Sequence, residues 1–279
     1  MTTGALLLVI GSAFIHATWN MAAKKASGGV IYVFFVGFMA ATFWSPLGIW
    51  LLATGKAVDA GTSMAAALWA TAMSSLLHAL YFSALQKGYS IGDMSLVYPL
   101  ARGTGPLLST ITAILLYGER PSLLALVGAV LIACGAVALT RPSHTPEVQP
   151  TTDADPAPDV VPARKVRRLD SAVTWGLITG VFIAGYTLWD KFALSVVGIN
   201  PLFLEWGTTV GRAVALGPIL AIAPASRSQL IPTFCAQWKP ALTVAVLSPV
   251  SYMMALTALK SSPVSYVAPM REMSILIGT

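Results

Sequence analysis

Nine apolar stretches, each about 20 residues long, dominate this chain and decide what it can fold into. A helix of about 20 apolar residues crosses a hydrocarbon layer roughly 30 Å thick. A strand with an open edge would leave backbone polar groups unsatisfied in lipid, so every stretch is expected to be helical. The sequence therefore predicts an all-α polytopic membrane protein. Its expected spans are residues 4–25, 30–52, 64–87, 92–117, 122–140, 172–194, 200–222, 240–260 and 264–279.

The composition excludes most soluble classes of protein. Charged residues make up 10% of the 279 residues, against roughly 25% in an average soluble protein. Lys and Arg outnumber Asp and Glu by 17 to 11, but these charges are too dispersed for a nucleic-acid surface. The two cysteines, Cys134 and Cys235, lack metal-ligand spacing, and the spans contain no HExxH, GxSxG or paired catalytic Asp motif. We therefore expect a lipid bilayer around the chain, and no enzyme activity, cofactor, metal or nucleic-acid partner.

The chain divides into two related halves. Between them lies a Pro-rich polar segment, residues 141–171, whose composition is typical of a disordered linker. An offset of 170 residues places Trp19 on Trp189 and, far downstream, residues 95–99 on residues 265–269. The first half holds five spans, an odd number, so the second copy enters the membrane from the opposite side. We therefore expect an inverted repeat, with five helices in residues 1–140 and an incomplete second copy in residues 172–279.

The second copy is shorter than the first. The same offset matches Thr279 with Ser109, so residues 110–140 have no counterpart. We interpret the difference as a C-terminal truncation that removes a tenth span. The alternative is that the protein departs from its own duplication.

Residues 95–139 combine a helix, a Gly-Glu-Arg-Pro turn at Gly118–Pro121 and a glycine-rich helix that follows it. This pattern resembles the EamA-like branch of the drug/metabolite transporter superfamily. Residues 17–26 and 262–272 are similar to a subgroup that includes membrane proteins associated with phosphonate use. The resemblance implies ten helices in two repeats. It also implies transport of a small metabolite by alternating access, here across a bacterial inner membrane. A truncated membrane interaction protein that does not transport is the alternative function.

Six charged residues lie well inside the predicted spans, away from their ends, where each costs roughly 2.5–3.5 kcal/mol on an insertion scale and persists mainly if paired or in contact with water. Three positive and three negative charges fit internal ion pairs that hold the bundle, or a site for an amino-acid-like, zwitterionic or anionic substrate. The guanidinium of Arg271 can clamp a carboxylate or phosphonate. Alternatively, Arg271 forms a fixed pair with Glu205 or Asp190. The six residues are Arg102, Asp190, Glu205, Arg212, Arg271 and Glu272.

Arg102 and Glu272 are matched by the 170-residue offset, and each follows a proline, Pro99 or Pro269, by three residues. We expect the two prolines to interrupt their helices at equivalent places. Discontinuous helices of this kind surround the binding site in many inverted-repeat transporters. The expected substrate site therefore includes both charges and Tyr98.

Polar and aromatic residues form one stripe in the first span and another in the sixth, because positions i, i+3 and i+4 share a helix face. A stripe of this kind can line a transport pathway, but its tryptophans fit an aromatic belt at the membrane interface equally well. Asp190 is also the candidate for proton coupling, because burial favours the neutral form of a carboxyl group. His16 and His78 are alternatives, although a lone histidine in an apolar helix more often only packs. The stripes are His16, Trp19 and Asn20, and Tyr186, Trp189 and Asp190.

Two further features are assigned structural roles. Glu119 and Arg120 are expected to shape the turn between the fourth and fifth spans. Gly128 and Gly135 belong to a small-residue face that allows close approach of another helix. We expect this face to pack in the scaffold or to form the contact of a homodimer.

Overall fold

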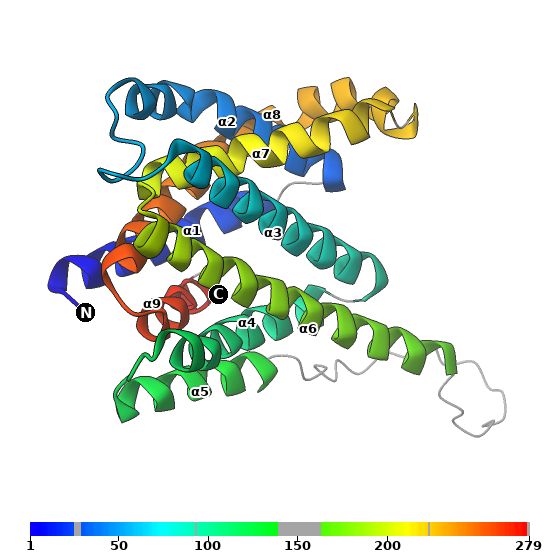
Figure 1. Ribbon diagram of the computed structural model, residues 1–279. Coiled ribbons are helices and arrows are strands. Elements are labelled where there is room, and N and C mark those ends of the chain that lie inside the picture. The colour runs from blue at the N-terminus through cyan, green and yellow to red at the C-terminus, as the bar shows by residue number, and fades with distance from the viewer. Residues whose placement is uncertain (25–28, 93, 139–162, 223, 278–279) are drawn as a thin grey trace, which may run out of the picture.

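The computed structural model describes residues 1–24, 29–92, 94–138, 163–222 and 224–277, and almost all of them are helical (Figure 1). Each predicted span overlaps a helix, and the last one overlaps two short helices. Five of the helices contain a stretch long and apolar enough to cross a membrane. A helical multi-span membrane protein is therefore confirmed, while nine crossings stay a prediction. The elements are α1 (Thr3–Lys24), α2 (Gly29–Ala53), α3 (Met64–Ile91), α4 (Met94–Tyr117), α5 (Leu123–Ala138), α6 (Ala163–Phe192), the π-helical turn η1 (Ala193–Val197), α7 (Pro201–Ile222), α8 (Pro224–Ser261), α9 (Val264–Arg271) and α10 (Met273–Ile277).

Two helices begin earlier than their apolar stretches do. α6 starts at Ala163 and α8 at Pro224, although the expected spans start at residues 172 and 240. The extension of α6 is polar and that of α8 mixes polar with apolar residues, and a helix can continue through such residues because its backbone hydrogen bonds, not its hydropathy, define its ends. The assignment of residues 163–171 to a linker is therefore wrong. The rest of the expected linker, residues 141–162, lies outside the described part of the chain.

The two prolines matched by the repeat have different effects. α4 continues through Pro99, whereas α9 ends at Arg271 with Glu272 as its C-cap, and α10 begins one residue later. α4 packs extensively along α6, and neighbouring helices can hold a proline-containing helix in shape. The expected interruption at Pro99 is therefore wrong, and the one at Pro269 lies slightly downstream of the proline.

Each half of the chain packs mainly against the other half. α1 lies along α8, α3 lies along α6, α2 contacts both α7 and α8, and α4 contacts α6 and α9. In Figure 1, α2, α7 and α8 lie together at the top, α4, α5, α6 and α9 lie at the bottom, and α1 and α3 run between them. The interior is therefore built jointly by helices of both halves.

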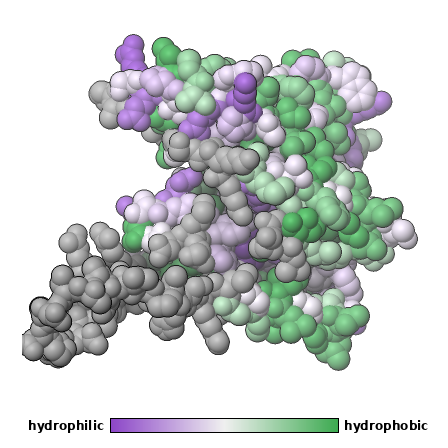
Figure 2. All heavy atoms as spheres, turned by 180° about the vertical axis from the view of Figure 1, so that it is seen from behind, coloured by the Kyte–Doolittle hydropathy of each residue, from purple (hydrophilic) through white to green (hydrophobic). Residues whose placement is uncertain are grey.

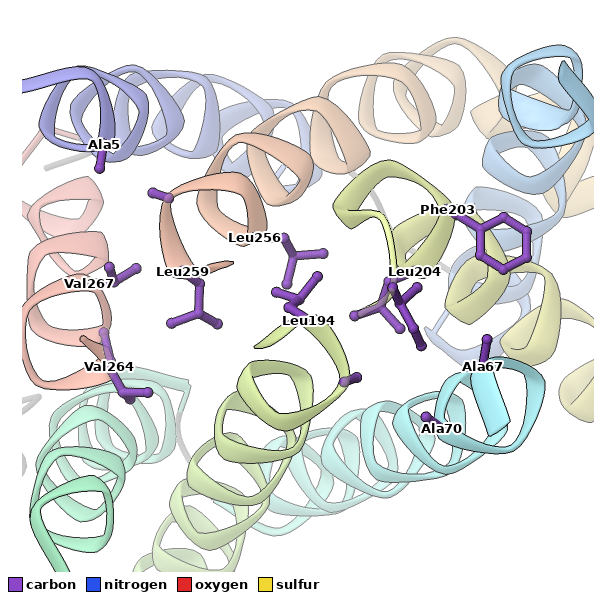
Figure 3. Close-up of a cluster of buried hydrophobic side chains, with 14 of the residues drawn as sticks. Ala5, Ala67, Ala70, Leu194, Phe203, Leu204, Leu256, Leu259, Val264 and Val267 are labelled. Atoms are coloured by element: carbon purple, nitrogen blue, oxygen red, sulfur yellow. The ribbon is translucent and has the colours of Figure 1, made fainter. Parts of the chain in front are cut away.

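The largest buried apolar cluster lies where η1, α7, α8 and α9 meet (Figure 3). Leu194, Leu204 and Leu256 have no exposed surface there. Ala67 and Ala70 of α3 face the same group, and their small side chains let α3 pack closely. Apolar side chains also cover much of the outer surface (Figure 2). Such a surface suits lipid, since lipid tails are as apolar as leucine.

Polar contacts tie the segment between α2 and α3 to the second half of the chain. Asp59 and Lys260 form an ion pair at 2.9 Å, and Val58 forms an isolated antiparallel bridge with Ile199. Gly198, just before this bridge, ends η1 with a φ of 83°, a left-handed conformation that favours glycine. One end of the bundle is thereby closed by contacts between the two halves.

α4 and α6 approach one another closely at Gly105. A Cβ atom added there would lie 2.7 Å from the Cβ of Ile183. At Gly128 and Gly135 in α5, an added Cβ would meet no atom of another element within 4 Å in the described part of the chain. The expectation that the α5 glycines permit close packing within the scaffold is therefore wrong. Their face stays a candidate for a homodimer contact.

Replacing Gly105 with alanine is expected to lower the midpoint of thermal unfolding, because the Cβ of Ile183 belongs to the helix framework and cannot rotate away. Overpacking of this kind costs about 1–3 kcal/mol. Gly128→Ala is the matched control, and it is expected to be neutral or slightly stabilising because alanine favours helix. Equal midpoints for the two variants, measured by circular dichroism of purified protein, would contradict the close approach of α4 and α6.

Candidate functional site

Arg102 and Glu272, the two charges matched by the repeat, form a buried ion pair. Arg102 Nε lies 2.9 Å from Glu272 Oε2, in a contact that is electrostatic rather than a well-aligned hydrogen bond, and the residues are 6% and 5% exposed. Arg102 Nη2 lies 3.2 Å from His16 Nε2, which accepts because a guanidinium can only donate. The guanidinium also lies over the ring of Tyr98 at 5.8 Å. Arg102 therefore joins α1, α4 and the end of α9.

Asp190 is the most deeply buried of the six charges, with no exposed surface. Ser74 Oγ donates to its Oδ1 and Tyr252 Oη donates to its Oδ2, both at 2.5 Å. His78 Nε2 lies 3.9 Å from the same Oδ2. Hydrogen bonds to a carboxylate are stronger than those between neutral groups. Asp190 thus connects α6 firmly to α3 and α8.

Aromatic rings line one side of Asp190. Tyr186, one helical turn earlier in α6, stacks on His78 with ring centroids 4.2 Å apart. Tyr252 meets the edge of His78 at 5.6 Å, and Tyr81 meets Tyr186 at 5.6 Å. We call these four residues the aromatic wall. Its π faces can contact a cation or an apolar group, and its hydroxyls can donate hydrogen bonds.

Arg271 has no ion pair in the described part of the chain. Its guanidinium lies over the ring of Tyr252, 4.8 Å from the centroid, and the residue is half-buried. The expected fixed pair with Glu205 or Asp190 is therefore wrong, although the Arg271 charge does act electrostatically on Asp190. Tyr252 connects the two, because its ring contacts Arg271 while its hydroxyl donates to Asp190. Sequence reasoning places Arg271 correctly near the other charges but does not foresee Tyr252.

Glu205 and Arg212 form a local cluster on α7. Arg212 Nη2 lies 3.8 Å from Glu205 Oε1 and donates to Thr209 Oγ1 at 3.1 Å. The hydroxyls of Thr208 and Thr209 each donate to the Glu205 carboxylate at 3.3 Å. Arg212 also lies over the ring of Phe82 in α3, at 5.4 Å. Glu205 and Arg212 therefore fit the interpretation as an internal ion pair that holds the bundle, because most of the groups that contact them lie on α7 itself.

The first half of the chain is also related to known proteins. Residues 3–141 match the EamA-like transporter family. No curated protein matches the chain. The family consists of membrane transporters, so its presence points to transport of small solutes rather than to an enzyme, while the phosphonate-associated subgroup and the truncated tenth span stay predictions.

The EamA-like half contributes His16 to the site, but the rest of its stripe is less involved. Trp19 packs edge-on against His16 at 4.6 Å, and its buried Nε1 has no acceptor among the described residues. Asn20 is half-buried, and its side chain forms no hydrogen bond in the described part of the chain. Asn20 and Asp190 are therefore matched by the repeat in sequence, but Asn20 does not share the hydrogen bonds of Asp190.

The stripe in α6 divides between the site and the apolar core. Tyr186 and Asp190 both contact α3, Tyr186 by stacking on His78 and Asp190 by accepting from Ser74. Trp189 instead donates from Nε1 to the carbonyl oxygen of Ala70 at 2.9 Å and packs against the core cluster. The expectation that Trp189 lines a substrate site does not fit this position, and neither does a simple belt at the membrane interface.

Three residues of the site, Ser74, Tyr81 and Tyr252, are absent from the sequence predictions. Hydroxyl side chains are ordinary in membrane helices, so none of the three attracts notice alone. A signal for Tyr252 does exist in the repeat. With the one-residue shift that aligns α3 of the EamA-like half with α8, Tyr252 falls on Tyr81, and both belong to the aromatic wall.

Proposed function

We propose that the protein is a secondary transporter that moves a small amino-acid-like metabolite, zwitterionic or anionic, across the bacterial inner membrane by alternating access. The EamA-like match supports transport as the activity. The substrate class rests on one observation, the half-buried Arg271 that has no anionic partner in the described part of the chain. The site is proposed to lie between the halves, around Arg271, Asp190 and the aromatic wall.

Of the three arginines inside the predicted spans, Arg271 is the one without a carboxylate partner in the described part of the chain. Arg102 and Arg212 each have a carboxylate partner, whereas Arg271 has the ring of Tyr252. A cation in the membrane interior is costly unless it meets a counter-ion, water or a ligand. A guanidinium binds a carboxylate or phosphonate through two parallel hydrogen bonds. A substrate anion next to Tyr252 would supply the partner that Arg271 does not find among the described residues.

Asp190 would recognise the opposite end of a zwitterion. Its carboxylate has about four acceptor positions, of which Ser74 and Tyr252 occupy two, so it can also accept from an ammonium group or bind a proton. The aromatic wall would contact the part of the substrate between the two charges. Asp190 is therefore also the proposed group for proton coupling, through competition between the proton and the substrate.

An inverted repeat with nine crossings is part of the proposal. α1 packs on α8 while α6, the counterpart of α1, packs on α3, the counterpart of α8. Such an exchange of partners is what a twofold axis between the halves produces. The ion pair of Arg102 with Glu272 supports the same axis, because positions matched by the repeat can touch only next to the axis. The adjoining residues His16 and Tyr98 would then lie at the centre of the transporter.

A thermal-shift screen of the purified protein tests the substrate class. Amino acids, dicarboxylates and alkylphosphonates are expected to raise the unfolding midpoint, because a ligand that binds only the folded state stabilises it by mass action. Methyl esters of the same acids and simple amines lack the anion, and we expect no shift from them. Shifts limited to amines, or no shift and no proteoliposome flux with any acid, would exclude the proposed class.

A further inference from the structure

Glu119 lies in the turn between α4 and α5, yet its carboxylate contacts the start of α9. Oε1 accepts a hydrogen bond from the backbone N–H of Val264 at 2.7 Å, and Oε2 accepts one from Ser265 at 2.9 Å. The first N–H groups of a helix have no acceptor within the helix, and a negative charge there is also favoured by the helix dipole. Glu119 therefore caps α9, in addition to its expected place in the turn.

The cap is supplied by another part of the chain because α9 cannot cap itself. Its N-cap residue is Pro263, which makes no side-chain hydrogen bond to the helix. The turn and the helix also contact each other a second time, since Tyr266 Oη accepts the N–H of Ser122 at 2.9 Å. Ser122 precedes α5, so each element satisfies a backbone group of the other.

The far end of α9 is held by α4, one of the two helices that flank this turn. Glu272, the C-cap of α9, forms the ion pair with Arg102 of α4 at 2.9 Å. Arg271 is the last residue of α9 and extends over Tyr252. The helix has 8 residues, which corresponds to a length of about 12 Å. A helix this short moves as a rigid unit, so its first turn and Arg271 are displaced together.

We propose that Glu119 is a positioning residue of the substrate site: its carboxylate fixes the start of α9 and thereby holds Arg271 in place over Tyr252. The inference rests on the proposed function in giving Arg271 the substrate anion. It adds that affinity for this anion depends on a glutamate in a turn of the EamA-like half that has, among the described residues, no hydrogen bond or ion pair with Arg271, Asp190 or the aromatic wall.

Glu119→Gln is the sharpest test, because the amide keeps the size of the carboxylate but presents an NH₂ group to one of the two N–H donors. At least one capping bond is then lost. We expect the half-saturating concentration of an acidic substrate in proteoliposomes to rise about tenfold, equivalent to about 1.4 kcal/mol, because Arg271 is then held less firmly. The maximal flux and the unfolding midpoint should change little.

Arg120→Gln is the matched control in the same turn, since Arg120 forms no ion pair in the described part of the chain and is expected to retain the original half-saturating concentration. A lower unfolding midpoint for Glu119→Gln with an unchanged half-saturating concentration would overturn the proposal, because it would show a structural role alone. If Glu119→Gln is not recovered folded, Glu119→Asp keeps the charge but withdraws it by one methylene group. The half-saturating concentration and the unfolding midpoint are then measured for Glu119→Asp, and the same results support or overturn the proposal.

A second measurement does not depend on knowing a substrate. Arg271→Cys is made in a chain whose exposed Cys134 and Cys235 are replaced by serine, and the rate of thiol alkylation is followed with and without Glu119→Gln. A severalfold change in rate is expected if α9 shifts. An unchanged rate overturns the positioning role, even if acids are transported. A changed rate without binding of any acid would instead contradict only the proposed function.

Discussion

Replacing Arg271 with alanine is expected to abolish transport while leaving the protein folded. Loss of one partner from a buried charge pair costs about 2–5 kcal/mol, so flux at low substrate concentration should fall by about 30-fold or more. The folded state loses only the contact with the ring of Tyr252 at 4.8 Å. Such cation–π contacts contribute about 0.5–2 kcal/mol. The variant should therefore reach the membrane in normal amounts and keep most of its thermal stability.

Two variants separate the shape of the Arg271 guanidinium from its charge. Arg271→Lys keeps the charge but loses the planar pair of donors, so we expect weak flux with a raised half-saturating concentration. Arg227→Ala removes an exposed arginine of α8 and should transport normally. Flux is measured in proteoliposomes with a radiolabelled acid selected by the thermal-shift screen. Normal flux in Arg271→Ala would remove this residue from the substrate site.

The helices were largely predictable because apolar length is a local property of the sequence. The expected span at residues 30–52 corresponds to α2 at Gly29–Ala53, and the one at residues 64–87 to α3 at Met64–Ile91. The starts of α6 and α8 were not predictable in this way, since polar residues extend α6 and a mixture of polar and apolar residues extends α8. Hydropathy locates the part of a helix that lipid can surround, but it does not predict where the helix begins or ends.

The buried charges were predictable because ionisable residues are rare in apolar spans, but their partners were not. Consecutive residues of an α-helix diverge by about 100° around its axis. Asp190 and Trp189 therefore face different neighbours, and only the arrangement of α3 decides which of them enters the site. Glu119 gave no sign of its contact with Val264, because a cap between residues 145 positions apart depends wholly on tertiary structure.

The ion pair of Arg102 with Glu272 is expected to give the largest effect on stability. Arg102→Met removes the positive charge and leaves Glu272, 5% exposed, without its counter-ion. Removing one partner of a buried ion pair costs about 3–5 kcal/mol. Methionine retains most of the aliphatic volume of arginine, so an empty cavity contributes little to this loss. We expect poor recovery of folded protein and a markedly lower unfolding midpoint.

The double variant Arg102→Met with Glu272→Leu tests whether charge is the cause. With both ionic groups replaced by apolar ones, neither has to be desolvated, and such replacements are often neutral or stabilising. We expect the unfolding midpoint to return close to that of the original protein. Asp59→Asn, which breaks the more exposed pair with Lys260, is the control and should cost less than about 1 kcal/mol. A double variant no more stable than Arg102→Met would show that Arg102 stabilises the fold through His16 and Tyr98 rather than by neutralising Glu272.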